Sequence, residues 1–352
     1  MMEKTLPEVC IIQYGFPFDS SKFCSAEGVP LVRIRDVVRG YSETYTTEIA
    51  GENYIVNDGD LLIGMDGEFN IAYWKGGRAY LNQRVCRLIP REDVDRDYIF
   101  YYMPQALKAI EDATPFVTVK HLSAKQLSKI LIPLPDMSEQ QRISAVLRSV
   151  DRVIAMRKKE LDELNNLVKS RFIELFGEPL SNQKGWQTMS IVEAAPIKSQ
   201  RGDLADEVWL LNLDAVEAQT GTVLFKHRVQ SGEINASTVY FTAESVLYSK
   251  LRPYLNKVVM PDEDGVATSE MIPMCPLADR LNRAYLCYWL RSDAFVRHIS
   301  EKVAGAKMPR VSMDYFRSLA IEMPPLELQE QFAAFVEQTD KSKLCGKMGV
   351  AA

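Results

Sequence analysis

Two stretches of the chain share one unusual pattern, in which prolines end an extended segment and a helix rich in Glu and Gln follows at once. The first is IPLPDMSEQQRI at residues 132–143, and the second is IEMPPLELQEQF at residues 321–332. A proline fixes its own φ, lacks an N–H and biases the preceding residue toward extended backbone. The pattern therefore predicts two junctions at which a globular unit passes into a helix.

Further matches between the two halves follow the same order along the chain. Their offsets are 189, 189, 187 and 185 positions, which is the drift that loop insertions produce. Four matches in one order predict an internal duplication, and this decides how the whole architecture is interpreted. The matched pairs are Pro135 with Pro324, Cys86 with Cys275, residues 98–103 with 285–290, and residues 61–63 with 246–248.

Each copy begins with a β-rich part and continues into a helix. Residues 29–35 alternate well enough for a strand, and residues 58–64 indicate a turn that enters a buried strand. Helices are predicted over residues 97–111 in the first copy and 282–302 in the second. At 352 residues the chain is long enough for two such domains, so we predict an α+β protein with two similar units.

A long helix is predicted to connect the two copies. Ser138 and Gln141 form a capping box at its start, and no Pro or Gly interrupts residues 139–176, a length of roughly 55 Å. Its apolar positions recur mostly at intervals of three and four, which describes a narrow stripe suited to one partner helix. We favour this over packing on a single domain because the stripe is so long. The stripe consists of Ile143, Leu147, Val150, Ile154, Leu161, Leu164, Val168, Phe172 and Leu175.

The second Glu- and Gln-rich helix, which carries Phe332 and Phe335, is shorter. It extends from Leu326 to about Lys343, before Gly346 and Gly349 weaken it, and spans roughly 27 Å. The long helix is expected to pair with it in a pseudo-twofold arrangement. Much of the stripe over residues 161–175 would then lack an intramolecular partner. Either another chain covers this stripe or the C-terminal helix is truncated, so we expect self-association or dependence on a partner.

Composition and motifs argue against chemistry in this chain. The sequence contains no phosphate-binding GxxxxGK[ST], no dinucleotide loop and no HExxH, and its six cysteines form no CxxC pair. Its three histidines have no nearby sequence partner that would complete a catalytic triad, so no catalytic residue and no metal site are predicted. No run of eighteen apolar residues exists, so a cytoplasmic location is expected.

Cationic and amide side chains gather in short stretches of both copies, although the net charge is −5. Arg33 and Arg35 would project from the same face of a strand and could meet phosphates or a guanine edge. Ordinary solvated loops explain each stretch equally well, but their occurrence in both copies favours DNA binding. The candidate DNA-binding residues are Arg33, Arg35, Lys75, Arg78, Asn82, Arg84, Lys120, Lys198, Arg201, Lys250, Arg252, Tyr254, Lys257, Lys307 and Arg310.

The chain resembles the specificity (S) subunit of type I restriction-modification enzymes over nearly its whole length. The proline-to-Glu-Gln-Gln junction is the most specific element of this resemblance. The stretches that carry it are residues 15–23, 30–36, 58–63, 132–135 and 139–143 in the first half, and residues 176–179, 182–186 and 323–331 in the second.

The resemblance implies a non-catalytic subunit that recognises a bipartite DNA sequence. Two target recognition domains, residues 1–137 and 177–325, would each read one half, while a spacer helix, 138–176, sets the gap and a C-terminal helix, 326–345, pairs with it. Modification and restriction subunits would dock on this chain. They would carry S-adenosylmethionine, ATP and Mg²⁺, and this chain would hold no cofactor.

Two alternatives from other classes remain open. The chain could be the recognition module of a standalone DNA methyltransferase or nuclease, or a protein–protein scaffold that uses its long helix alone.

Overall fold

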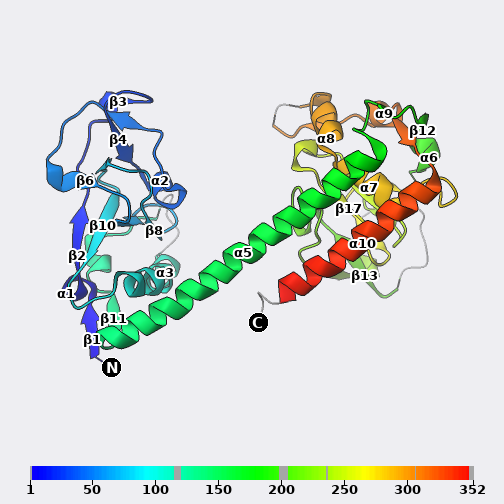
Figure 1. The fold of residues 1–352 in the computed structure, drawn as a ribbon. Helices are drawn as coiled ribbons and strands as arrows, with labels where there is room; N and C mark the ends of the chain where they lie inside the picture. Colours follow the sequence, from blue (N-terminus) through cyan, green and yellow to red (C-terminus); the bar gives the residue numbers. More distant parts are fainter. Residues whose placement is uncertain (1, 115–119, 198–204, 235–236, 306, 349–352) are drawn as a thin grey trace. The chain divides into compact units, whose positions relative to one another are not determined.

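The computed structural model describes residues 2–114, 120–197, 205–234, 237–305 and 307–348. The chain divides into two compact units, unit 1 (Met1–Ile154) and unit 2 (Ala155–Ala352). Helix α5 (Met137–Phe176) begins in unit 1 and ends in unit 2, and it is the long green helix of Figure 1. Within the described ranges, we find no helix with the length and hydropathy needed to cross a bilayer.

Unit 1 contains a four-stranded sheet in the order β2-β10-β7-β8, a five-stranded sheet in the order β3-β5-β4-β9-β6, and the pair β1-β11. Its strands are β1 (Met2–Thr5), β2 (Cys10–Tyr14), β3 (Phe23–Cys24), β4 (Val29–Val32), β5 (Tyr45–Thr46), β6 (Ile55–Val56), β7 (Leu61–Gly64), β8 (Asn70–Tyr73), β9 (Ala79–Leu81), β10 (Val85–Pro90) and β11 (Leu131–Leu134). Its helices are α1 (Leu6–Val9), η1 (Ser20–Lys22), α2 (Ile34–Arg39), η2 (Glu52–Tyr54), α3 (Arg96–Ala113) and α4 (Ala124–Leu127).

Strand β7 is buried on both faces, as the sequence predicts for residues 61–64. Leu61 and Ile63 belong to the core that α3 covers, whereas Leu62 points into a second core with Trp74 and Val85. This alternation follows from the two-residue period of a strand. The four-stranded sheet therefore joins α3 on one side to the five-stranded sheet on the other.

Unit 2 repeats this organisation with smaller sheets, in the orders β14-β13-β18-β15, β17-β16-β19, β12-β22 and β20-β21. Its strands are β12 (Gln187–Ser190), β13 (Glu207–Leu211), β14 (His227–Gln230), β15 (Val239–Phe241), β16 (Val246–Ser249), β17 (Val258–Val259), β18 (Gly265–Ala267), β19 (Met271–Met274), β20 (Val303–Ala304), β21 (Arg310–Val311) and β22 (Ala320–Met323). Its helices are α6 (Ile191–Ala194), η3 (Leu213–Ala215), η4 (Ser231–Glu233), η5 (Pro253–Leu255), α7 (Arg283–Arg291), α8 (Asp293–Ser300), α9 (Met313–Arg317) and α10 (Leu326–Met348).

Hydrogen bonds and strand register support the duplication, with one correction. The Tyr98 hydroxyl donates to the Pro133 carbonyl, and the Tyr285 hydroxyl donates to the Glu322 carbonyl, as offsets of 187 and 189 require. The match of Cys86 with Cys275 is wrong. Cys86 pairs with Ile63 across the sheet, and the counterpart of Ile63, Tyr248, pairs with Ile272. Cys86 therefore corresponds to Ile272, and the presence of a cysteine near this position in both copies is a coincidence.

A buried glutamine closes both proline junctions. Gln140 accepts a hydrogen bond from the Asp95 N–H (2.8 Å) and donates to the Pro135 carbonyl (2.9 Å). Gln329 does the same with the Asn282 N–H (2.8 Å) and the Pro324 carbonyl (2.7 Å). One side chain thus ties the first turn of α5 to the N-cap of α3 in unit 1, and one ties the first turn of α10 to the N-cap of α7 in unit 2.

The predicted capping box at Ser138 and Gln141 is wrong. Helix α5 already begins at Met137, and the Asp136 carboxylate accepts the Glu139 N–H at 2.9 Å, which makes Asp136 the N-cap. The predicted single helix over residues 282–302 is also wrong. It is divided into α7 and α8 at Ser292, whose extended backbone ends α7 and whose hydroxyl caps α8 at the Phe295 N–H.

The apolar stripe of α5 is covered where we expected it to be free. Val168 and Phe172 are buried in the core of unit 2, with Leu175 packed against it. Phe332 of α10 is buried there too, 5.3 Å from Phe172 between ring centroids, and Phe335 packs nearby. Figure 1 shows α10, in red, beside this part of α5. The stripe thus has an intramolecular partner over residues 168–175, where Phe172 contacts Tyr285 of α7 and Phe332 of α10.

The uncovered apolar positions lie earlier in α5. Ile143 packs on the core of unit 1, Ile154, Leu161 and Leu164 are half-buried, and Leu147 and Val150 are exposed. Further exposed apolar side chains of this stretch are Val146, Val153 and Met156.

Candidate nucleic-acid interface

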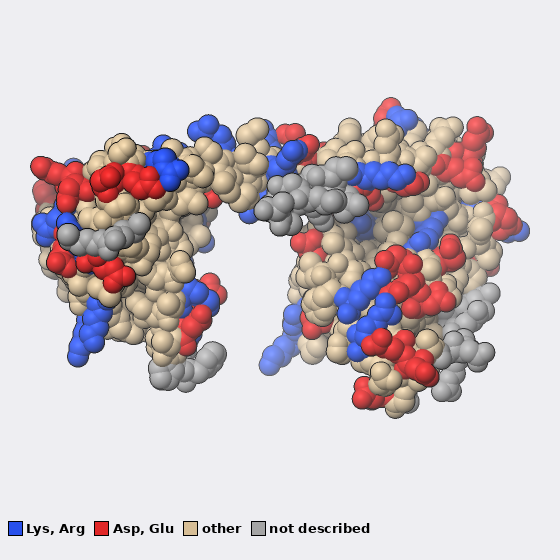
Figure 2. Space-filling model, turned by 90° about the horizontal axis from the view of Figure 1, so that it is seen from below, with Lys and Arg blue, Asp and Glu red and all other residues tan. Residues whose placement is uncertain are grey.

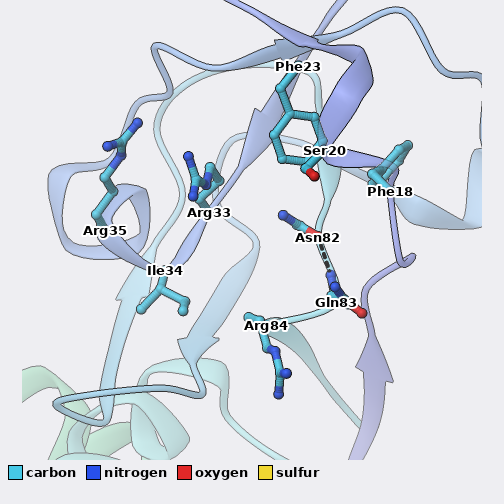
Figure 3. Close-up of a pocket in the computed structure, with 9 residues that line it drawn as sticks. All are labelled: Phe18, Ser20, Phe23, Arg33, Ile34, Arg35, Asn82, Gln83 and Arg84. Atoms are coloured by element: carbon cyan, nitrogen blue, oxygen red, sulfur yellow. Dashed lines mark hydrogen bonds between the residues drawn. The ribbon is translucent and has the colours of Figure 1, made fainter. Parts of the chain in front are cut away.

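A shallow cavity of about 390 Å³ in unit 1 collects four of the predicted residues, Arg33, Arg35, Asn82 and Arg84. Strands β4 and β9 are parallel, with Val32 beside Leu81, so the residues that follow them meet at one edge of the sheet. Figure 3 shows Arg33 and Arg35 on one side of this cavity and Phe18 and Phe23 on the other. The sequence brings these side chains together only through that parallel pairing.

The predicted strand over residues 29–35 ends earlier than expected. β4 stops at Val32, and the buried Asp36 carboxylate accepts the Arg33 N–H at 2.9 Å, so helix α2 begins at Ile34. Arg33 and Arg35 therefore do not share a strand face. They still line the same cavity, Arg33 from the N-cap of α2 and Arg35 from its first turn.

Aromatic side chains, which sequence reasoning missed, complete the cavity around Arg33 and the predicted Asn82. The guanidinium of Arg33 lies 5.9 Å from the ring centroid of Phe23. The Asn82 side chain accepts the Gln83 N–H at 2.8 Å, which fixes its orientation (Figure 3). Phe18 and Ser20 line the wall. Phe16, Phe18 and Phe23 are close in sequence, and this is the one signal that could have identified the wall.

Arg84 extends away from Asn82 in Figure 3. Its guanidinium belongs to a second polar cluster, with Asp66 and His121. Its Nε lies 3.5 Å from Oδ2 of Asp66, and Nδ1 of His121 lies 2.5 Å from Oδ1 of the same carboxylate. The sequence offers His121 no nearby partner, and in the structure an isolated bridge brings it beside Asp66, 55 positions away. Sequence distance hides this contact.

The other unit 1 candidates lie outside the cavity. Arg78 pairs with Glu52 at 2.8 Å, and both side chains are exposed. Lys120 donates to the Glu111 carbonyl at 2.7 Å at the end of α3, and Lys75 is exposed after β8.

Unit 2 brings its candidates from two segments together at one edge. The Arg252 N–H donates to the Pro309 carbonyl at 2.8 Å, and Arg252 itself is exposed with a left-handed φ of 49°. Lys250 is half-buried, and Tyr254 and Lys307 are exposed. Arg310 forms a paired hydrogen bond with Glu270. Lys257 instead turns inward and donates to the Leu213 carbonyl at 2.6 Å.

Lys198 and Arg201 lie outside the described residues. Among the described cations of unit 2, Lys226 and Arg228 are tied to acidic side chains, at 2.7 Å from Asp262 and 2.7 Å from Glu263. The hydrogen bond from Lys226 lowers the pKa of Asp262, and that from Arg228 lowers the pKa of Glu263. Figure 2 accordingly shows basic and acidic side chains intermixed on the visible face of each unit. The described residues contain no group of three or more metal-ligating side chains.

Comparison with known proteins decides the family. A family model described as the type I restriction modification DNA specificity domain matches residues 1–166 and again residues 183–345. The chain belongs to this family. The two matches of the specificity domain fall on the two halves that the duplication predicts, which confirms the resemblance and the α+β fold with its long central helix.

Relatives of this specificity family agree. The type I restriction enzyme EcoBI specificity subunit of Escherichia coli is 40% identical over 167 residues, which cover 47% of this chain and 35% of that relative. The MjaVIII specificity subunit of Methanocaldococcus jannaschii is 22% identical over 359 residues, which cover 88% of this chain and 82% of that relative. The fold is similar to the crystal structure of the S subunit from M. genitalium, with a TM-score of 0.59 at 12% identity, covering 99% and 92%. A second similar structure comes from work on complex assembly and conformational transition of the type I R-M system. Its TM-score is 0.56 at 16% identity, and the match covers 99% of this chain and 93% of that chain.

Proposed function

We propose that this chain is the DNA-specificity subunit of a type I restriction-modification system and that each unit recognises one half of a bipartite DNA sequence. The observation that carries this is the repeat of one topology in two units, each matched by the specificity-domain model. Two similar readers on one chain are the arrangement that a split target requires.

The edge of each unit supplies suitable contacts. Arginine forks and amide groups are the side chains that read base edges in the major groove, and lysines hold phosphates. In unit 1 these are Arg33, Arg35 and Asn82 around the cavity, and in unit 2 Arg252 and Tyr254 lie on an exposed loop.

Helix α5 is proposed to set the gap between the half-sites. It contains neither Pro nor Gly over 40 residues. Its exposed apolar side chains Val146, Val150, Val153 and Met156 are proposed to contact modification subunits or a second copy of the chain. Methylation with S-adenosylmethionine and ATP- and Mg²⁺-dependent cleavage would reside on partner subunits, in the same cytoplasmic compartment.

Selection from a random duplex library with the purified full chain tests this function. We expect a split motif with a gap of fixed length, and an affinity that falls steeply with salt in proportion to the phosphates neutralised. With Mg²⁺ and S-adenosylmethionine added, the chain alone should leave the DNA unmodified. Methylated or cut DNA would favour a standalone enzyme, and absence of any DNA binding would favour a scaffold.

A further inference from the structure

At one edge of each unit an acidic side chain holds an exposed arginine. In unit 1 Oδ2 of Asp66 lies 3.5 Å from Nε of Arg84. In unit 2 Arg310 donates to Glu270 from Nε (3.0 Å) and Nη2 (2.9 Å). The arginine side chains are 51% and 44% exposed, whereas the acids are 20% and 23% exposed. Each acid is therefore an inner anchor, and each arginine reaches solvent.

The two edges share the same pattern of backbone hydrogen bonds. The Arg84 carbonyl accepts the Met65 N–H at 3.0 Å, as the Glu270 carbonyl accepts the Lys250 N–H at 3.0 Å. Position 84 therefore corresponds to position 270.

The opposing segments also correspond. The Met65 carbonyl accepts the Leu122 N–H at 2.7 Å, and the Lys250 carbonyl accepts the Val311 N–H at 3.0 Å. His121 thus corresponds to Arg310. The anchored arginine comes from one segment in unit 1 and from the opposing segment in unit 2.

The anchors leave the outer end of each guanidinium available. Nη1 of Arg84 lies 3.4 Å from Nδ1 of His121, but the same nitrogen lies 2.5 Å from Oδ1 of Asp66. A ring nitrogen that donates to this carboxylate cannot also accept from Arg84, so Nη1 keeps its donors for another acceptor. In unit 2, Nη1 of Arg310 makes one long contact within the described residues, to the Met308 carbonyl at 3.5 Å. A guanidinium held by an ion pair in unit 1, or by hydrogen bonds in unit 2, can present its terminal N–H groups to the N7 and O6 acceptors of guanine.

We propose that Arg84 and Arg310 each read a guanine in the half-site of their own unit, and that Asp66 and Glu270 position them. This rests on the proposed function and deepens it, because it separates base-reading residues from cations that contact phosphates. Since the arginine has changed segment between the units, the two units present it from different sides of the edge and read different half-sites.

The test is library selection with full-length variants. Arg84→Lys keeps the charge but removes the fork, so preference for guanine should fall roughly 5- to 150-fold at one position of one half-site. The other half-site and the affinity for unrelated DNA should stay unchanged. Arg310→Lys should do the same in the opposite half-site. Asp66→Asn and Glu270→Gln, which remove only the anchors, should relax the same two positions.

Arg78→Lys is the matched control, because Arg78 is also paired with an acid, Glu52, but lies outside the cavity and its acid is exposed. It should change no base preference. If the unmodified chain selects a split motif and neither arginine variant alters it, this inference is wrong and the proposed function stands. A chain that selects no DNA sequence would overturn both.

Discussion

Gln140 and Gln329 show how much one buried amide contributes at the junction between a unit and its helix. Gln140 is 1% exposed and satisfies the Asp95 N–H and the Pro135 carbonyl. Replacing it by Leu leaves both backbone groups without this partner in the interior. We therefore expect Gln140→Leu to lower the free energy of unfolding by roughly 2–4 kcal/mol, measured as a lower urea midpoint.

The neighbouring Gln141 is the matched control, because it is exposed. Gln141→Leu should change the free energy of unfolding by less than about 0.5 kcal/mol. Equal midpoints for the two variants would contradict the role of Gln140. The sequence shows the repeated Glu-Gln pattern but not which glutamine is buried, because this depends on which face of α5 packs against the start of α3.

At the scale of the element, α5 carries one apolar stripe in two environments. Val150 is exposed, whereas Val168 is buried against α7 and α10. Val168→Asp should cost more than about 4 kcal/mol, because it places an unpaired charge in the core. Val150→Asp should cost less than about 1 kcal/mol and should instead abolish co-elution with the modification subunit in size-exclusion chromatography. Unimpaired co-elution would count against the proposed contact.

The length of this helix is predictable from sequence, but the partner of each position is not. The absence of Pro and Gly predicts residues 139–176 as one helix, and the structure has it at Met137–Phe176. Which part of the stripe is covered depends on α7, whose contribution no periodicity in α5 reveals. The end of β4 was equally hidden, because a side chain three residues later, Asp36, bonds back to Arg33.

At the scale of the whole molecule, the proposed spacing role of α5 predicts how the DNA gap responds to its length. Inserting seven helix-forming residues between Lys158 and Lys159 adds about 10.5 Å and nearly two full turns. At about 3.4 Å per base pair the selected gap should widen by about three base pairs, with both half-sites unchanged. Replacing residues 152–158 by the same heptad, without changing the length, should leave the gap as it was. An insertion that leaves the gap constant would exclude α5 as its determinant.

The sequence predicts the residue types of the candidate site better than it predicts which of these residues come together. Arginines and amides in both copies were visible in the sequence, and four of them meet in one cavity because β4 and β9 are parallel. Arg78 and Lys257 have the same chemistry but lie elsewhere, since Glu52 and the Leu213 carbonyl hold them. Which cations reach the cavity depends on contacts between residues tens of positions apart, and local sequence patterns do not reveal such contacts.

The backbone at Arg252 shows what its side chain costs the protein. Its N–H bonds the Pro309 carbonyl just as the N–H of Gly67 bonds the Lys120 carbonyl, and Gly67 adopts this turn with a φ of 77°. A residue with a Cβ is strained there by about 1 kcal/mol or more, yet unit 2 retains an arginine. Unit 2 thus gives up stability at a position where unit 1 does not, in exchange for a cation at its surface. Glycine at position 252 would relieve this strain, so Arg252→Gly is expected to raise the free energy of unfolding by about 1 kcal/mol.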